Sequence, residues 1–440
     1  MDSAGSVHVI SKELIKPSSP TPDHLKTLNL SVLDQITPPV YISLIFFYEA
    51  DELKGSASSM DQAQVCQHLK QSLSNTLTSF YPLAGKIDPE SYTVYCDDEG
   101  VEFVEARAHA RLRDVVQDAK LEEFQKFLPV DPLRGIHVGE GGTLFMVQIN
   151  FFDCGGVAVA ACVSHLVADG SSLVDFMNAW AATCRGENPK SAPEFGVFGR
   201  CFPARDLSDS NISPALLMGN DKLVTKRIVF DKEKLAALKQ AAATGSDDVR
   251  DPTRVEAVSA FILKHFIEHN PLDANKTLLA AGHAVNIRSR ASPPLDNTFG
   301  NGCVTAAAEF SHQHRSPAPE LHELASKLRR AIRTIDDEYI RETEREDRFL
   351  RDLGRLCDLV SEGEAEAFLF SSWCRFPMYE VDFGWGKPVW VCTTALLVNN
   401  LAILMSTRDG NGIEAWINLL PDHVQSLEEQ FKHIGSTNQD

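Results

Sequence analysis

Residues 143–184, TLFMVQINFFDCGGVAVAACVSHLVADGSSLVDFMNAWAATC, decide the fold that the sequence predicts. Two apolar runs, 143–152 and 156–164, are typical of β-strands, and the Asp-Cys-Gly-Gly sequence between them favours a tight hairpin. After the second run, apolar side chains recur at helical spacing: Leu173, Phe176, Met177 and Trp180. His165 is therefore expected at a junction between a strand and a helix.

Strand and helix patterns alternate along the rest of the chain, which favours an α/β fold. Apolar and β-branched runs predict a hairpin over 92–108 and strands at 7–17, 40–50, 226–230, 278–290, 367–373, 389–394, 401–407 and 412–419. Helical periodicity predicts helices over 61–80, 231–243 and 253–269, and a charged helix near 320–360. Residues 186–223 are rich in Pro, Gly, Asn and Ser and predict a crossover loop between an N-terminal domain, 1–185, and a C-terminal domain, 224–440.

The composition indicates a folded protein without a polyanionic partner. Of the 440 residues, 43% are apolar and 23% charged, which is enough to bury large cores. With 61 acidic and 42 basic residues, the formal charge of −19 repels phosphate backbones and anionic lipids, so we expect neither a nucleic-acid nor a membrane partner. No run of about 18 apolar residues and no signal-peptide pattern occurs, which favours a cytoplasmic protein.

Metal binding is not expected from the sequence. The ten cysteines lie far apart without zinc-ligand spacing, and we interpret them as reduced, mostly buried thiols. His312 and His314 form a pair with no third ligand nearby, so a solvated loop is the simpler interpretation.

The segment His165-Leu166-Val167-Ala168-Asp169-Gly170, an HxxxDG motif, carries the clearest chemistry. An imidazole with an ordinary pKa of about 6.5 can take a proton from an alcohol at neutral pH, provided that a second group fixes its tautomer. Gly170 permits a turn or a close backbone approach. On this motif alone, a core histidine at a strand end is an equal alternative.

A second motif, DFGWG at 382–386, places two glycines around a tryptophan. Taken alone, it is most simply a turn between strands whose aromatic rings fill the core.

The two motifs together make the chain resemble the plant BAHD acyl-CoA-dependent acyltransferases. Other segments agree in order: SFYPLAGKI at 79–87, TRVEAVSAFI at 253–262, VNIRSR at 285–290, NTFGNGC at 297–303 and GIEAWINL at 412–419. The resemblance covers essentially the whole chain, and residues 13–35 look most like the vinorine synthase-like branch of alkaloid and terpenoid acetyltransferases.

The resemblance implies an α/β fold of two chloramphenicol-acetyltransferase-like domains, with mixed β-sheets flanked by helices and an active-site channel at the domain interface. It implies that His165 is the general base that deprotonates an acceptor hydroxyl, which attacks the thioester of an acyl-CoA in a ternary complex. Acetyl-CoA or another short acyl-CoA is the expected co-substrate, without a bound cofactor. An alkaloid or terpenoid alcohol is the first choice of acceptor, and a monomer is expected.

Further site residues are also implied by the resemblance. Asp169 and Gly170 support the site, with the Asp169 carboxylate turned away from the channel and paired with Arg288. The second motif gives structural support through Asp382, Gly384, Trp385 and Gly386. The expected CoA contacts are Ser259, Asn286, Arg290, Gly300 and Asn301. The sequence names no oxyanion donor and no metal ligand.

Departures from related patterns narrow the substrate. Anthocyanin acyltransferases carry a YFGNC segment, whereas here Thr298 replaces its first residue and Gly302 is inserted, which disfavours flavonoid glycosides as acceptors. Condensation domains of peptide synthetases have a second histidine where this chain has Ser164. Two alternatives stay open: N-acylation of an amine acceptor, and a non-catalytic family member that binds a metabolite.

Overall fold

The computed structural model describes residues 5–50, 61–131, 142–189, 192–213, 216, 218, 223–245, 249–269, 278–311 and 318–435. The chain divides into two compact units. Unit 1 comprises residues 1–205, 297–302 and 376–395, and unit 2 comprises 206–296, 303–375 and 396–440. The chain first passes from unit 1 to unit 2 after residue 205, which lies inside the predicted crossover loop, 186–223.

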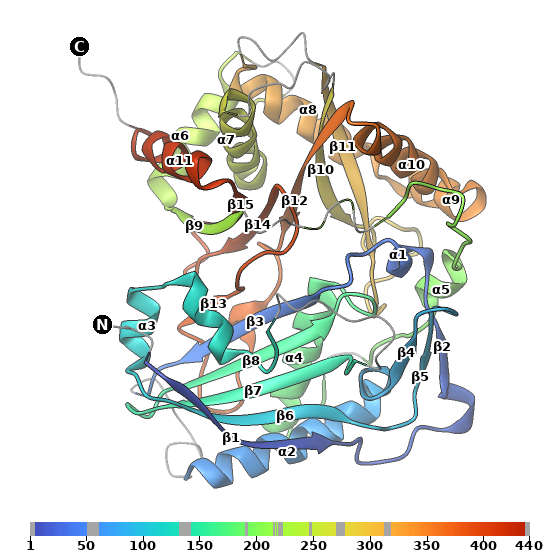
Figure 1. Ribbon diagram of the computed structural model, residues 1–440, viewed down its shortest axis with the longest axis vertical. Helices are drawn as coiled ribbons and strands as arrows, with labels where there is room; N and C mark the ends of the chain where they lie inside the picture. The colour runs from blue at the N-terminus through green and yellow to red at the C-terminus, as the bar shows by residue number, and fades with distance from the viewer. Residues whose placement is uncertain are drawn as a thin grey trace. The chain divides into compact units, whose positions relative to one another are not determined.

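Unit 1 is built on a mixed β-sheet (Figure 1). In spatial order its strands are β1 (Val7–Ile15), β6 (Val101–Ala108), β7 (Phe145–Phe152), β8 (Val157–Ser164), β3 (Tyr41–Tyr48) and β13 (Trp390–Cys392). All neighbours are antiparallel except β6 and β7. Every residue of β7 and β8 is buried, as their mostly apolar sequences favour for central strands. The hairpin predicted from 143–164 is confirmed.

The hairpin predicted over 92–108 is wrong. Strand β5 (Thr93–Tyr95) belongs to a small sheet between β2 (Thr27–Asn29) and β4 (Lys86–Asp88), whereas β6 pairs with β1 and β7. The expected turn does exist, because Asp98 and Gly100 both have positive φ, at 59° and 104°. It redirects the chain from one sheet to another, and the Asp98 carboxylate accepts hydrogen bonds from the Thr21 amide and hydroxyl at 2.8 and 2.7 Å.

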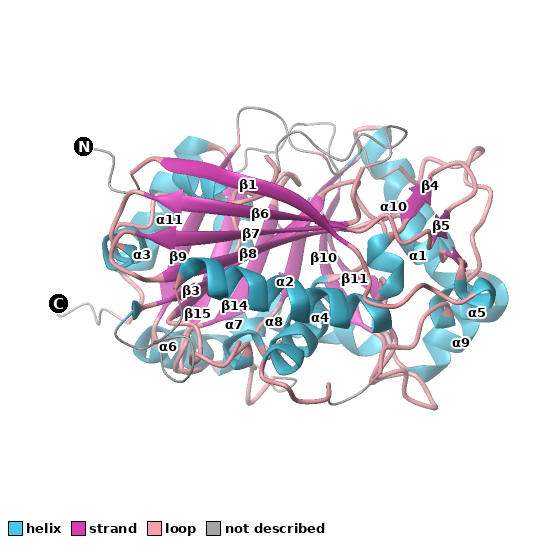
Figure 2. Cartoon of the chain, turned by 90° about the horizontal axis from the view of Figure 1, so that it is seen from below, coloured by secondary structure: helices cyan, strands magenta, loops and turns pink. Residues whose placement is uncertain are grey.

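Helices α2 (Gln62–Ser79) and α4 (Gly170–Cys184) pack against each other and run across one face of the unit 1 sheet (Figure 2). Aromatic residues of the 3-10 helix Leu121–Phe127 pack against Phe47 of β3, with Phe124 and Phe127 each 6.2 Å from it between ring centroids. Shorter helices of unit 1 are α1 (Val32–Gln35), α3 (Leu112–Gln117) and α5 (Val197–Cys201).

Two C-terminal segments join unit 1, whereas the sequence analysis assigned both, with the DFGWG motif, to the domain 224–440. The physical reason at 376–395 is strand pairing, because Trp390 and Val391 of β13 pair with Phe47 and Phe46 of β3. The Trp390 ring also stacks on Phe47 at 5.6 Å. At 297–302, Glu194 forms a parallel bridge with Thr298. Sequence proximity is therefore a poor guide to the boundary here.

Unit 2 contains a second mixed sheet. Its strands, in spatial order, are β11 (Cys303–Ser311), β10 (Leu278–Asn286), β12 (Ala365–Ser372), β14 (Leu401–Ser406), β15 (Ile413–Leu419) and β9 (Val224–Phe230). Helices α6 (Lys232–Ala243), α7 (Arg254–His269), α8 (Leu321–Thr334) and α11 (Pro421–Lys432) supply apolar side chains to a common core with these strands (Figure 1).

The charged region near 320–360 forms three helices rather than one. After α8 come α9 (Asp337–Glu346) and α10 (Arg348–Ser361). Asp336, two residues after the end of α8, begins the next helix, because its carboxylate caps α9 by accepting from the Tyr339 amide at 2.9 Å. Asp347, at φ 54°, separates α9 from α10.

Candidate active site

His165 directly follows β8 and precedes α4, as the sequence predicts. Its amide donates at 2.9 Å to the carbonyl of Val40, the residue directly before β3, which ties His165 to the start of that strand. The Thr37 hydroxyl donates to the His165 carbonyl at 3.2 Å. The backbone at His165 is thus held from both directions, and its side chain is partly exposed.

Asp169 caps the helix that follows. Its Oδ1 accepts from the Ser172 amide at 2.9 Å, and its Oδ2 accepts from the Gly302 amide at 2.9 Å. Gly170 is the buried first residue of α4. An Asp at the N-cap satisfies amides that have no partner within the helix and complements its positive end. Asp169, at 4% exposure, therefore joins α4 to the segment 297–302.

The segment 297–302 approaches α4 closely. The Asp169 amide donates to the Gly300 carbonyl at 3.3 Å, and the Ser172 hydroxyl lies 3.0 Å from the same oxygen. Gly300 has a φ of +135°, and a Cβ there would lie 3.2 Å from the Phe198 ring. A glycine suits this position on both counts. We predicted Gly300 as a CoA contact, and that role stays a prediction.

Asn301 contacts the His165 ring, although the sequence analysis expected it among the CoA contacts. The Asn301 Oδ1 lies 3.1 Å from His165 Nδ1. The Asn301 Nδ2 donates to the His165 carbonyl at 2.7 Å and to Asp34 Oδ1 at 2.7 Å. All of these atoms belong to unit 1.

Asp34 is a buried residue that the sequence analysis missed. It is 4% exposed and lies in α1, where Ser31 is the N-cap. The spacing Ser31-x-x-Asp34 is a recognisable capping box. That pattern predicts the helix cap, but the contact with Asn301, 267 residues away, has no local signal.

The electrostatic environment favours a neutral His165. Burial lowers the pKa of His165 below its ordinary value of 6.5, and the Asp169 carboxylate and the Asn301 hydrogen bond act in the opposite direction. The net direction is downward, so the imidazole carries a lone pair at neutral pH. A neutral imidazole is the protonation state that a general base requires.

The DFGWG motif forms a compact loop in unit 1. The Asp382 Oδ1 accepts from the amides of Gly384 and Gly386, each at 2.8 Å. Both glycines have positive φ, at 97° and 115°. The Phe383 and Trp385 side chains are 2% and 3% exposed. The loop is thus organised by its own carboxylate.

Aromatic contacts fix this loop to the core of unit 1. Phe383 lies 4.9 Å from Trp180 of α4, and Trp385 lies 5.8 Å from Tyr48 of β3, between ring centroids. The Tyr48 hydroxyl donates to the Val381 carbonyl at 2.8 Å. The motif therefore packs against α4, the helix that follows His165, and against β3, the strand that pairs with β8.

Other predicted site residues lie in unit 2. Ser259 is wholly buried in α7, and its hydroxyl has no hydrogen-bond partner among the described residues. The Asn286 side-chain oxygen accepts from the Arg288 amide at 3.0 Å and guanidinium at 3.3 Å. Arg288 is 4% exposed, and its pairing with Asp169 stays a prediction.

Arg290 closes the end of a helix in unit 2. Its guanidinium donates to the carbonyls of Ile332 and Ile335 at 2.8 and 2.5 Å, at the C-terminal end of α8. A cation at this position satisfies carbonyls that lack partners within the helix. The CoA contacts predicted at Ser259, Asn286 and Arg290 stay predictions.

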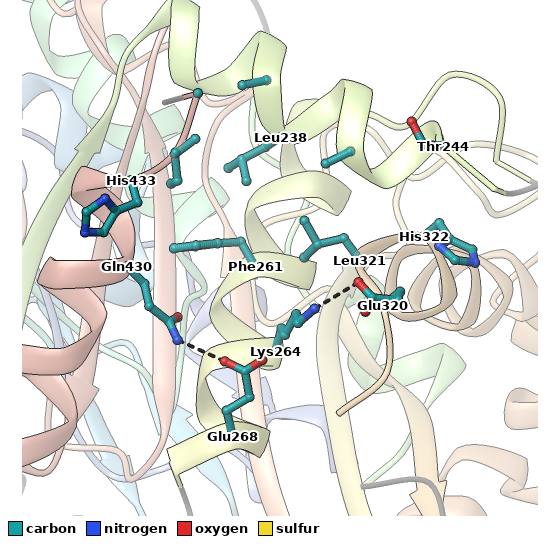
Figure 3. Close-up of a pocket in the computed structure, with 14 residues that line it drawn as sticks. Leu238, Thr244, Phe261, Lys264, Glu268, Glu320, Leu321, His322, Gln430 and His433 are labelled. Atoms are coloured by element: carbon teal, nitrogen blue, oxygen red, sulfur yellow. Dashed lines mark hydrogen bonds and ion pairs between the residues drawn. The ribbon is translucent and has the colours of Figure 1, made fainter. Parts of the chain in front are cut away.

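A separate cavity of about 780 Å³ lies wholly within unit 2 (Figure 3). Phe261 and Leu238 form part of its apolar wall. On its polar side Lys264 pairs with Glu320 at 2.9 Å. None of the predicted site residues lines it.

The described residues contain neither a metal-binding cluster nor a membrane-spanning helix. Across the described ranges, no group of three or more His, Cys, Asp or Glu side chains could hold a metal ion. His312 and His314 lie outside the described residues. Among the helices of the described ranges, none combines the length and the apolar character that crossing a membrane requires.

A model described as the Transferase family matches residues 5–434 of this chain. The chain belongs to this BAHD acyltransferase family. Stemmadenine O-acetyltransferase of Catharanthus roseus is 39% identical over 440 residues, covering 99% of each chain. Vinorine synthase of Rauvolfia serpentina is 40% identical over 429 residues, covering 96% of each chain.

Solved structures agree with this BAHD assignment. The crystal structure of vinorine synthase gives a TM-score of 0.81 at 37% identity and covers 98% of each chain. F. graminearum TRI101, solved with coenzyme A and deoxynivalenol, gives a TM-score of 0.68 at 17% identity, covering 93% of this chain and 98% of its own. The latter likeness shows the fold alone. The predicted α/β fold with mixed sheets is confirmed.

Proposed function

We propose that this BAHD enzyme transfers an acetyl or other short acyl group from CoA to a hydroxyl of a plant specialised metabolite, with an alkaloid or terpenoid alcohol as the acceptor. The observation that carries the proposal is the position of His165, a neutral imidazole held between β8 and α4 and hydrogen-bonded through Nδ1 to Asn301. The proposal is supported by stemmadenine O-acetyltransferase, which is similar over the whole chain and is named for the transfer of an acetyl group to an oxygen.

In the proposed reaction, His165 removes the proton from the acceptor hydroxyl as the oxygen attacks the thioester carbonyl. The tetrahedral intermediate then collapses, the carbon–sulfur bond breaks, and the imidazolium returns the proton to the CoA thiolate. The products are an ester and free CoA, and no covalent acyl-enzyme is required. Holding both reactants together supplies up to about 7–11 kcal/mol of the barrier reduction, and the base adds about 10²- to 10⁴-fold.

The proposed co-substrate is acetyl-CoA. TRI101, which shares the fold, was solved with coenzyme A, and we assign an acyl-CoA to this chain as the donor. We propose further that the enzyme is a cytosolic monomer without a nucleic-acid or membrane partner. All ten cysteines are free thiols, as a reducing compartment requires, and the charge is −19.

The test is acyl transfer by purified wild type and His165→Ala, with acetyl-CoA and a panel of alkaloid, terpenoid, phenolic and amine acceptors. Products are detected by mass spectrometry, and free CoA is measured in the same tubes. We expect an acetylated alcohol with the wild type and a loss of about 10²- to 10⁴-fold in kcat for His165→Ala. His109→Ala, at an exposed histidine of the same unit, is the matched control and should retain full turnover.

Three other outcomes would redirect the proposal. Products formed only from amines would indicate N-acylation. Acceptor binding without turnover, in the wild type as in the variant, would indicate a metabolite-binding family member. Equal turnover by wild type and His165→Ala would refute the general-base role.

A further inference from the structure

The orientation of the Asn301 amide can be worked out from its neighbours. Nδ2 lies 2.7 Å from the His165 carbonyl and 2.7 Å from Asp34 Oδ1. A backbone carbonyl can only accept a hydrogen bond, and so can a carboxylate oxygen that carries no proton. The NH₂ group must therefore face both of these atoms, because the opposite orientation would set three oxygens against one another.

This orientation determines which ring nitrogen of His165 carries the proton. The Asn301 Oδ1 faces Nδ1 at 3.1 Å, and an amide oxygen can only accept. Nδ1 must then be the donor. In a neutral imidazole with a proton on Nδ1, the lone pair lies on Nε2.

Asp34 is itself held in place by separate donors on its two oxygens. The Ser31 amide and hydroxyl both donate to Oδ2, at 2.7 and 2.6 Å. The Asn301 amide nitrogen Nδ2 and, at 3.4 Å, its backbone N–H occupy Oδ1. Burial raises the pKa of Asp34, and the hydrogen bonds from Ser31 and Asn301 oppose that shift. A proton taken up on Oδ2 could be donated to the Ser31 hydroxyl, so Oδ1 accepts from Asn301 in either state.

We propose that Asp34 is a positioning residue that acts through Asn301 to keep the proton of neutral His165 on Nδ1 and the lone pair on Nε2. The inference rests on the proposed role of His165 as the base. Asp34 touches no reacting atom. Its carboxylate also completes the cap of α1, so the experiment must separate positioning from helix stability.

The first measurement compares kcat and KM for Asp34→Ala and Asp34→Asn with the wild type. We expect kcat to fall about 10- to 100-fold, the worth of a hydrogen bond to a charged group, while KM for acetyl-CoA changes little. Asp34→Asn preserves the size of the side chain if Asp34→Ala fails to fold. Its single oxygen cannot serve both Ser31 and Asn301, so one of the two contacts is lost.

Ser31→Ala is the matched control. It removes the hydroxyl that caps the same helix and donates to Oδ2 of Asp34, but it leaves Oδ1 available to Asn301. We expect lower thermal stability with a much smaller loss of kcat than in Asp34→Ala, because the Ser31 amide still donates to Oδ2. An equal loss of kcat and of stability in Ser31→Ala and Asp34→Ala would assign Asp34 to the helix cap alone and overturn the proposal.

A double-mutant cycle tests whether Asp34 acts through Asn301. In the Asn301→Ala background, Asp34→Ala should cause no further loss of kcat, because the contact between them is already gone. Multiplicative losses would overturn the proposal. The tautomer is read directly from the ¹⁵N chemical shifts of the His165 ring, which should show a proton on Nδ1 in the wild type and a mixture of tautomers in Asp34→Ala.

The two proposals fail in different ways. An active His165→Ala enzyme would remove the general base and, with it, any role for Asp34 through that base. An inactive His165→Ala enzyme together with a fully active Asp34→Ala enzyme would refute only the positioning role.

Discussion

Acid should destabilise unit 2 through His283, a buried histidine of β10. Its side chain is 3% exposed, and its ring stacks on Phe370 with centroids 4.8 Å apart and planes 13° apart. Nε2 has no hydrogen-bond partner among the described residues. Burial lowers the pKa of His283 to about 4, and the Glu256 carboxylate opposes this shift only in part.

The sign and size of the effect follow from linkage. An unfolded histidine has a pKa of about 6.5, so the unfolded chain binds the proton more tightly than the folded one. Above pH 6.5 the buried neutral His283 does not lower the free energy of unfolding. As the pH falls from 6.5 toward 4, the unfolded chain takes up a proton that the folded chain does not, and the free energy of unfolding decreases. Between pH 7 and pH 5 we expect His283 to remove roughly 2 kcal/mol from the free energy of unfolding.

The assay is urea denaturation of wild type and His283→Leu from pH 8 to pH 5. Leucine is of similar size and does not titrate, so the difference between the two curves isolates this site from all other titrating groups. The variant should gain roughly 2 kcal/mol relative to the wild type between pH 7 and pH 5. His433→Leu, at an exposed position of the same unit, is the control for replacing a histidine with leucine. A difference between wild type and His283→Leu that is constant across this pH range would refute the reasoning.

Two further predictions concern unit 1. The acid limb of the pH profile of kcat/KM should lie below about pH 6.5, because burial lowers the pKa of His165. Asp169→Asn should move this limb to still lower pH, because the Asp169 carboxylate raises that pKa. A move to higher pH would contradict this electrostatic account. Asp382→Ala should lower the free energy of unfolding by roughly 2–4 kcal/mol in urea denaturation, because the amides of Gly384 and Gly386 lose a charged acceptor. Asp382→Asn keeps an oxygen that can accept these hydrogen bonds and should be destabilised less. Equal losses in the two variants would show that the negative charge of Asp382, and not its ability to accept hydrogen bonds, stabilises the loop.

The parts of the fold predicted correctly from the sequence are those with local periodicity. The runs 143–152 and 156–164 became β7 and β8, and the helical spacing after them became α4. Because β7 pairs with β8, the next strand in the sequence, the local hydrophobic pattern is enough to predict these elements and their pairing.

The parts that could not be predicted depend on distant partners. β5 and β6 separate because β6 pairs with the distant strands β1 and β7, whereas β5 pairs with β4, which directly precedes it, and with the distant β2. Asp34, His165 and Asn301 meet although His165 and Asn301 are 136 residues apart and Asp34 and Asn301 are 267 apart. The motif identified the histidine, but no spacing rule identifies the amide and the carboxylate beside it.

The pairing of β13 with β3 also has a consequence for synthesis on the ribosome. Unit 1 is interrupted after residue 205, and its edge strand ends only at Cys392, 187 residues later. At about 5–20 residues per second, the nascent chain waits roughly 10–40 s for that strand. During this interval β3 is paired with β8 but lacks β13 on its other side, and the rings of Tyr48 and Trp180 lack the DFGWG loop. We therefore expect chaperones to bind the incomplete chain at the sheet edge and at the apolar surface that residues 376–395 later cover.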